Sequence, residues 1–124
     1  METLNQISYD IIGASYKVHS ALVPGLLEST YEVCLEYELI KIGYKVERQK
    51  PLPVIYDGVF LDAGYRIDLL VEDSVIVELK SVNEMIPIFK AQLMTYLKLA
   101  ELKLGLLLNF NVTDVQKGIT RIVM

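Results

Sequence analysis

The chain has 124 residues, of which 52 % are hydrophobic and 23 % are charged. We therefore expect one domain, residues 1–124, with a well-filled core or an additional buried surface such as a dimer interface. The net charge of −4 argues against a simple basic binder of nucleic acid, although local charge or a bound cation can still create such a surface.

The chain begins with METLNQISYD, which has neither a basic segment nor a long apolar core, so no signal peptide is predicted. No apolar run is long enough for a membrane span, and we expect a soluble cytoplasmic protein. Apolar residues at helical spacing predict a first helix over residues 4–21. After a break at Pro24-Gly25, a second helix is predicted over residues 26–42, with Gly43 as its stop.

The single cysteine, Cys34, lies in this second helix. One cysteine excludes an intrachain disulfide and a zinc site built from cysteines. We interpret Cys34 as a buried free thiol. His19, the single histidine, is interpreted as a packing or capping residue near the end of the first helix.

The rest of the chain is predicted to contain strands and one more helix. The predicted strands are residues 44–49, 52–56, 65–71, 75–80, 103–109 and 119–123, and the third helix is 87–102. Pro51 and Pro53 favour an edge position or an irregular start for the second strand, and Asp57-Gly58 is a turn signal. This order of elements predicts an α/β fold with helices packed on a mixed central sheet.

Two neighbouring strands carry the clearest chemical pattern. Glu78 and Lys80 are two positions apart in one strand, so both side chains leave the same face. If residues 72–74 form the connecting loop, Asp68 falls opposite Glu78, with about 5 Å between the Cβ atoms. Two carboxylates this close repel each other unless a positive group lies between them, and a divalent cation fits the gap. The alternative is a structural ion pair of either carboxylate with Lys80 or Arg66.

A third carboxylate belongs to the predicted second helix. At about 100° per residue, Glu28 projects between Leu35 and Leu39, inside the apolar stripe of the helix. We expect Glu32 and Glu36 on the polar side. Glu28 is therefore either part of a site on the sheet or a first-turn glutamate favoured by the helix dipole.

The predicted third helix presents Gln92 and Tyr96 on one face, because they are four residues apart. A buried glutamine needs hydrogen-bond partners. The partner could be a metal ligand, a water molecule or a phosphate group. The alternative is an ordinary glutamine at the edge of the core, beside a core tyrosine.

Several motifs occur together in an order that is known from one family. They are GLLESTY at 25–31, the stretch 47–54, GYRIDLLVEDSVIVELK at 64–80, AQLMTYLKL at 91–99 and GLLLNF at 105–110. Over nearly the whole chain these motifs resemble the GxxExxY family of the PD-(D/E)xK nuclease superfamily. The resemblance implies a restriction-endonuclease-like core, in which helices flank a mixed central β-sheet.

The resemblance also implies roles for the matched residues. Asp68 and Glu78 would ligate Mg²⁺ or Mn²⁺, and Glu28 would complete the metal shell or orient a bound water molecule. Lys80 would position the attacking water or stabilise charge on the scissile phosphate.

The third helix adds a supporting element and one departure from the family. Gln92 and Tyr96 resemble the QxxxY element of helicase-associated nucleases, which supports the active site from a helix. Phe89 and Lys90 stand where the family often has a His-Glu pair.

These observations predict a metal-dependent nuclease that acts on DNA in preference to RNA. The alternative is a non-catalytic binding or assembly module with the nuclease fold, which the acidic composition and high apolar content favour. A basic cleft beside the carboxylates would favour the nuclease, whereas a solvated strand rim would not. The candidate residues for this cleft are Lys45, Arg48, Lys50, Arg66 and Lys90. We expect nucleic acid as the partner, and a homodimer or further partner to hold duplex DNA.

Overall fold

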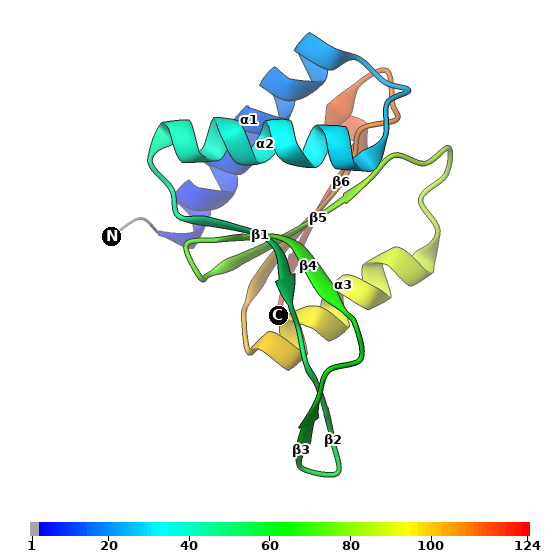
Figure 1. Cartoon of the computed structure of the whole chain (residues 1–124). Helices are drawn as coiled ribbons and strands as arrows, with labels where there is room; N and C mark the ends of the chain where they lie inside the picture. Colours follow the sequence, from blue (N-terminus) through cyan, green and yellow to red (C-terminus); the bar gives the residue numbers. More distant parts are fainter. Residues whose placement is uncertain (1–2) are drawn as a thin grey trace.

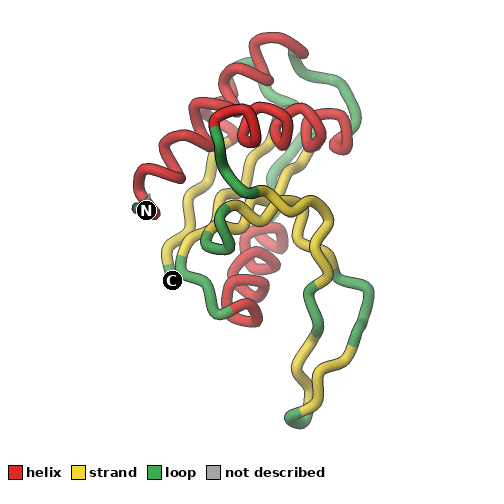
Figure 2. The backbone as a smooth tube through the Cα atoms, turned by 60° about the vertical axis from the view of Figure 1, so that its left-hand side comes forward, coloured by secondary structure: helices red, strands yellow, loops and turns green. Residues whose placement is uncertain are grey.

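The computed structural model describes residues 3–124 as a β-sheet between two layers of helices (Figure 1). The helices are α1 (Leu4–Leu22), α2 (Glu28–Ile42), α3 (Pro87–Ala100) and the short 3-10 helix η1 (Val115–Gly118). The strands are β1 (Val46–Pro51), β2 (Val54–Tyr56), β3 (Val59–Leu61), β4 (Arg66–Val71), β5 (Val75–Lys80), β6 (Leu104–Asn109) and β7 (Ile119–Val123). Helices α1 and α2 cover one face of the sheet and α3 covers the other, whereas the β2–β3 hairpin projects outward (Figures 1 and 2). The predicted α/β fold, in which helices flank a mixed central sheet, is confirmed.

The main sheet has five strands in the order β1-β4-β5-β6-β7. Its neighbouring strands are antiparallel except β5 and β6, which run parallel because α3 crosses over between them. Strand β5 is the middle strand, and every residue from Val75 to Leu79 is buried. A strand that is covered on both faces needs apolar residues on both, which explains the nearly continuous apolar run.

Side chains of the sheet alternate between two hydrophobic cores. In β5 the odd-numbered residues pack with α1 and α2, whereas Ile76 packs with α3. By the same alternation, Glu78 and Lys80 leave the sheet on the α3 side. Gly105 lets α3 pack closely on β6, because a Cβ atom there would come within 2.9 Å of the Leu93 side chain.

The main difference from the predicted elements is a short hairpin. The predicted strand 52–56 is shortened to Val54–Tyr56, and an unpredicted strand, Val59–Leu61, pairs with it. The intervening Asp57 and Gly58 have φ angles of 54° and 72°. Two positive φ angles are what a two-residue type I′ turn requires, so the turn signal marked a hairpin whose second strand is too short for a visible periodicity.

The other elements follow their predicted signals. The predicted ranges 4–21, 26–42, 44–49, 65–71, 87–102 and 103–109 agree with the structure to within two residues at each end, and 75–80 and 119–123 match it. Helix α2 ends at Gly43, whose φ of 114° lies in the left-handed region. His19 is buried with its Nε2 atom 2.6 Å from the carbonyl oxygen of Val112, which confirms a packing role. Within residues 3–124, no helix combines the length and the apolar character that a membrane span needs.

Candidate active site

Strands β4 and β5 separate where the two strand carboxylates meet. Their ladder starts with Val71 opposite Val75, the register that a three-residue loop predicts, and it ends one residue short of Asp68 and Glu78. Beyond this point β4 continues to pair with β1, and β5 continues to pair with β6. The two strands therefore form a fork, and the carboxylates lie at its base.

In this fork each carboxylate accepts a hydrogen bond from the backbone of the opposite strand. The Asp68 N–H donates to Glu78 Oε2, and the Leu79 N–H donates to Asp68 Oδ2, both at 2.9 Å. The side chains thus satisfy N–H groups that lie beyond the end of the β4–β5 ladder. Backbone donors on both sides hold the two carboxylates next to each other.

Burial makes ionisation of Glu78 unfavourable. The residue is 8 % exposed, and burial together with the charge of Asp68 raises the pKa of Glu78 to about 9. Within residues 3–124 neither carboxylate forms an ion pair, and Arg66 pairs with Asp62 instead, at 3.8 Å. The structural ion pairs considered as an alternative are therefore not formed, and the carboxyl pair must hold a proton or a cation.

Lys80 lies beside the carboxylates and contacts an aromatic ring. Its Nζ atom is 4.4 Å from the centroid of the Phe89 ring. The face of an aromatic ring attracts a cation without neutralising it. Burial raises the pKa of both Glu28 and Glu78, and the positive charge of Lys80 opposes that rise. The positive charge of Lys80 therefore lies close enough to Glu28 and Glu78 to stabilise their ionised forms, and no described acidic side chain forms an ion pair with it.

A cavity of about 320 Å³ opens on the α2 side of the fork. Its walls are formed by Leu27, Glu28, Ser29, Glu32, Gln49 and Asp68. Glu28 is half-buried at the start of α2, and its pKa is raised by burial and further by the charge of Asp68. The helix carboxylate and the strand carboxylate therefore share one opening.

Glu32 and Gln49 also line this cavity, although neither was predicted as a site residue. The expectation that Glu32 lies on the polar side of α2 is wrong, since the residue is 5 % exposed. The Nε2 atom of Gln49 donates to Glu32 Oε1 at 2.6 Å and to Asp68 Oδ1 at 3.1 Å. The four-residue spacing of Glu28 and Glu32 is the signal that could have identified Glu32, because it places both on one side of the helix.

Gln49 has an unusual backbone conformation for a residue within a strand. Its φ is 55°, and the β1–β4 ladder lacks the pair that would join Gln49 to Asp68. A left-handed φ costs a residue with a Cβ atom about 1 kcal/mol or more, and it persists only where the surrounding structure enforces it. In this conformation the side-chain amide of Gln49 bridges the carboxylates of Glu32 and Asp68.

Helix α3 contributes a tyrosine to the opposite side of the fork. Gln92 Nε2 donates to the Tyr96 hydroxyl at 3.0 Å. Tyr96 is buried, and its pKa is raised by burial and by the nearby charge of Glu78. Its ring meets the Tyr65 ring edge-on, with 5.9 Å between centroids. Gln92 is therefore hydrogen-bonded to Tyr96, which lies within electrostatic range of Glu78 and Asp68.

The basic residues considered for a cleft are largely neutralised by acidic neighbours, which favours the alternative of a solvated strand rim. Lys45 pairs with Glu47 and Asp73, Arg48 with Glu32 and Glu36, Lys50 with Glu47, and Arg66 with Asp62. Of the five residues, Lys90 alone forms no ion pair with any residue in 3–124. The rim of the sheet is thus an ion-paired, solvated surface and not a free basic cleft.

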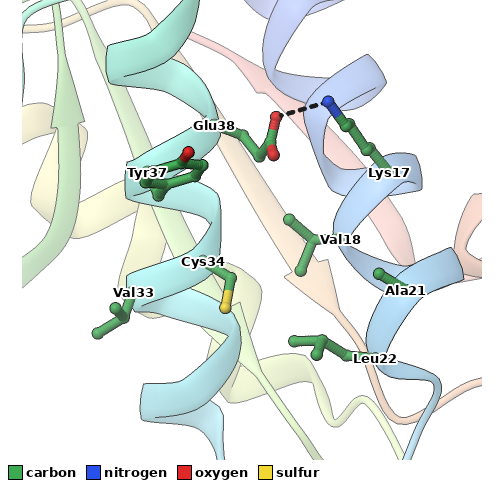
Figure 3. Close-up of a pocket in the computed structure, with 8 residues that line it drawn as sticks. All are labelled: Lys17, Val18, Ala21, Leu22, Val33, Cys34, Tyr37 and Glu38. Atoms are coloured by element: carbon green, nitrogen blue, oxygen red, sulfur yellow. Dashed lines mark ion pairs between the residues drawn. The ribbon is translucent and has the colours of Figure 1, made fainter.

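A second cavity, of about 360 Å³, lies between α1 and α2 (Figure 3). Its lining is mainly apolar, and an ion pair between Lys17 and Glu38 (3.1 Å) joins the two helices beside it. Cys34 faces this cavity as a free thiol, as expected, but it is partly buried and not buried as predicted. The cavity lacks the convergent polar groups of the fork, and we do not assign it to the active site.

The donor atoms in the fork fit a hard divalent cation. Among residues 3–124, no three histidine, cysteine, aspartate or glutamate side chains are grouped closely enough to hold a metal ion alone. Mg²⁺, however, is commonly bound through one or two carboxylates, while water and substrate phosphate oxygens fill the other positions. A cation can also replace the proton that burial and Asp68 impose on Glu78. Asp68 and Glu78 are the residues that would hold it.

A known protein family matches almost the whole chain. The model of the PD-(D/E)XK nuclease superfamily matches residues 5–122. The matched range includes every residue of the fork and of the two flanking helices described above. The searches of curated proteins and of solved structures found no match.

Proposed function

The chain belongs to the PD-(D/E)XK nuclease superfamily, and we propose that it is a nuclease that hydrolyses phosphodiester bonds of DNA, in preference to RNA, with Mg²⁺ or Mn²⁺. The observation that carries the proposal is the buried carboxyl pair of Asp68 and Glu78, next to a lysine whose charge is not neutralised. A fork that served only stability would gain from an ion pair or from apolar side chains. The finer resemblance to the GxxExxY family remains a prediction.

Asp68 and Glu78 would bind the metal directly, and Glu28 would complete its shell or orient a water molecule bound to it. The bound metal supplies a nucleophilic hydroxide at neutral pH and offsets charge on the phosphate. Gln49 would keep Asp68 in place through the hydrogen bond at 3.1 Å. Glu32 would hold Gln49 in turn, through the bond at 2.6 Å.

Lys80 would act on the phosphate or on the attacking water. Its contact with Phe89 leaves the ammonium hydrogens able to donate. A positive group aimed at developing negative charge is a strong source of transition-state stabilisation. Gln92 and Tyr96 would support the α3 side of the site, where Tyr96 lies near the carboxylates.

The test of this proposal has a binding part and a cleavage part. Mn²⁺ is titrated by calorimetry into the wild-type protein and into Asp68→Asn, and both proteins are then incubated with labelled DNA and RNA. We expect Mn²⁺ binding and cleavage by the wild type, and loss of both in the variant. A folded wild-type protein that neither binds Mn²⁺ in the presence of DNA nor cleaves any substrate would overturn the proposal.

A second candidate function is a non-catalytic binding or oligomeric assembly module. Two observations favour it: the ion-paired basic residues, and the projecting hairpin with Tyr56 and Phe60 about 70 % exposed. Apolar residues on a projecting hairpin are suited to contact with another copy of the chain. Sedimentation at several concentrations separates the two functions when combined with the Mn²⁺ titration, since an assembly module would form oligomers without binding metal.

A further inference from the structure

A third cavity, of about 460 Å³, lies between α3 and the base of the β2–β3 hairpin. Val54 and Tyr65 form one wall, and Ile88, Gln92, Tyr96 and Leu99 of α3 form the other. None of the residues that line it is charged, in contrast to the carboxylate cavity on the α2 side of the fork. Its volume falls within the range of small-molecule binding sites.

Two observations place this cavity near the α3 side of the fork. Tyr96 lines the cavity, and it lies close enough to Glu78 for that charge to help burial raise the pKa of its hydroxyl. Ile88 lines the cavity and is followed in the chain by Phe89, whose ring contacts Lys80. A ligand that reaches from the fork into the cavity would therefore place its charged part near Lys80 and the carboxylates, and its neutral part against Tyr96.

The chemistry of the cavity matches a nucleobase. Tyr65 is 44 % exposed and lines the cavity, so part of its ring can contact a stacked base. The bond from Gln92 to Tyr96 uses one hydrogen of the amide, and the other hydrogen and the carbonyl oxygen can bond to the edge of a base. The apolar side chains of Ile88 and Leu99 complete a neutral, partly aromatic site.

We propose that this cavity binds an unpaired base of the nucleotide next to the scissile phosphate, and that the substrate is therefore single-stranded or locally unpaired nucleic acid. The proposal rests on the nuclease function proposed above and specifies its substrate class. A base in a duplex is stacked and paired, and it must leave the stack before it can enter a lateral pocket. The phosphate of the same nucleotide is negatively charged, and Lys80 and a metal ion held by the carboxylates would attract it.

The test uses the absence of tryptophan from the chain. The substitution Tyr65→Trp creates a single fluorophore in the wall of the cavity, at a position exposed enough to accept the larger ring. The protein is titrated in EDTA with a single-stranded oligothymidylate and, separately, with a hairpin duplex. We expect the single strand to quench the tryptophan emission at a concentration at least about tenfold lower than the duplex, because a stacked base contributes strongly to binding.

Two further substitutions separate filling of the cavity from general damage to α3. Ala91→Phe fills the cavity from an exposed position of its lining, whereas Met94→Phe adds the same ring at an exposed position of α3 outside the lining. In the Tyr65→Trp background we expect Ala91→Phe to abolish quenching and Met94→Phe to leave it unchanged. In the protein that keeps Tyr65, we expect Ala91→Phe to raise the KM for single-stranded DNA about tenfold or more and to retain Mn²⁺ binding.

The outcomes distinguish this proposal from the nuclease function itself. Equal quenching by single strand and duplex, or quenching that survives Ala91→Phe in a folded protein, overturns the base pocket while metal binding and cleavage can still stand. Selective quenching in a protein that binds no Mn²⁺ and cuts nothing supports the pocket and overturns the nuclease. Circular dichroism melting of each variant shows that it is folded.

Discussion

The backbone N–H of Asp68 donates to the carboxylate of Glu78, while Asp68 itself accepts from the N–H of Leu79, the residue that follows Glu78. The two acidic residues are therefore locked together across the fork by the backbone that carries them. The mutual repulsion of the carboxylates cannot be relieved by a change of rotamer without the loss of these bonds. This arrangement makes the fork a source of instability that a cation can relieve.

The first prediction concerns the stability of the metal-free protein. We expect Glu78→Gln to stabilise it in EDTA by about 1–2 kcal/mol at alkaline pH, because the amide keeps the hydrogen bond from Asp68 and removes the buried charge. The folded-state pKa of Glu78, about 9, lies above the ordinary value of 4.5. The destabilisation by Glu78 is therefore absent below pH 4.5 and grows as the pH rises toward 9. Thermal melts across this range test it, and a pH-independent difference between the two proteins would contradict it.

The second prediction concerns the pH dependence of metal binding. A metal ion must displace the proton from the Asp68–Glu78 pair, so its affinity should rise with pH until Glu78 is ionised in the absence of metal, near pH 9. We expect up to about tenfold tighter Mn²⁺ binding per pH unit below that value. Calorimetry in buffers of different ionisation enthalpy should detect one released proton. Binding that is flat across this range would show that Glu78 is not a ligand.

The third prediction separates Lys80 from the metal ligands. Lys80→Met keeps the length of the side chain over Phe89 but removes its charge, and we expect cleavage to fall by about 100-fold or more. Mn²⁺ affinity should stay the same or increase slightly, because a positive charge near the site is lost. Single-turnover cleavage and calorimetry measure the two effects. Equal losses of affinity and rate would make Lys80 a structural residue.

The fourth prediction distinguishes the two features of Gln49, its side chain and its backbone strain. We expect both Gln49→Ala and Gln49→Gly to weaken Mn²⁺ binding several-fold, since both lose the hydrogen bond to Asp68. Gln49→Gly should be the more stable of the two by about 1 kcal/mol, because glycine accepts the φ of 55° without strain. Chemical denaturation gives the stability difference. Equal stabilities would mean that the strand relaxes when the bridge is removed.

The fifth prediction follows from the ion pairs along the sheet rim. Lys45, Arg48, Lys50 and Arg66 are each paired with an acidic residue, so few cations remain to displace counterions from DNA. We expect log K for DNA binding to fall with log salt at a slope no steeper than about −3, equivalent to about three phosphate contacts. Fluorescence anisotropy over a salt series measures the slope. A slope near −6 would mean that these ion pairs open on binding.

The parts of the fold that could be predicted from the sequence are those with a strong local period. The apolar run of β5 and its short loop after β4 were sufficient to place Asp68 next to Glu78, because period two and a tight turn fix the register. The spacing of Gln92 and Tyr96 was sufficient to place them in contact.

The residues that the sequence analysis did not predict depend on long-range contacts. Glu32 was expected on the polar side of α2, but the rim of β1 packs against that side and buries it. Gln49 has no local sequence pattern, because its role depends on a left-handed backbone angle at a break in the β1–β4 ladder. The strand at Val59–Leu61 was also beyond prediction, since three residues are too few for a period.

The candidate site includes residues from both helix layers and from the sheet between them. Glu28 comes from α2, Asp68 and Lys80 come from the two strands of the fork, and Tyr96 comes from α3. Its integrity therefore depends on the docking of both layers and not only on the survival of the sheet. The site can be no more stable than the least stable element that contributes to it, as hydrogen exchange would measure it. Local opening of either α2 or α3 is therefore sufficient to abolish the site. Heat inactivation should thus precede the loss of β-sheet structure, and catalytic half-life will report on helix docking.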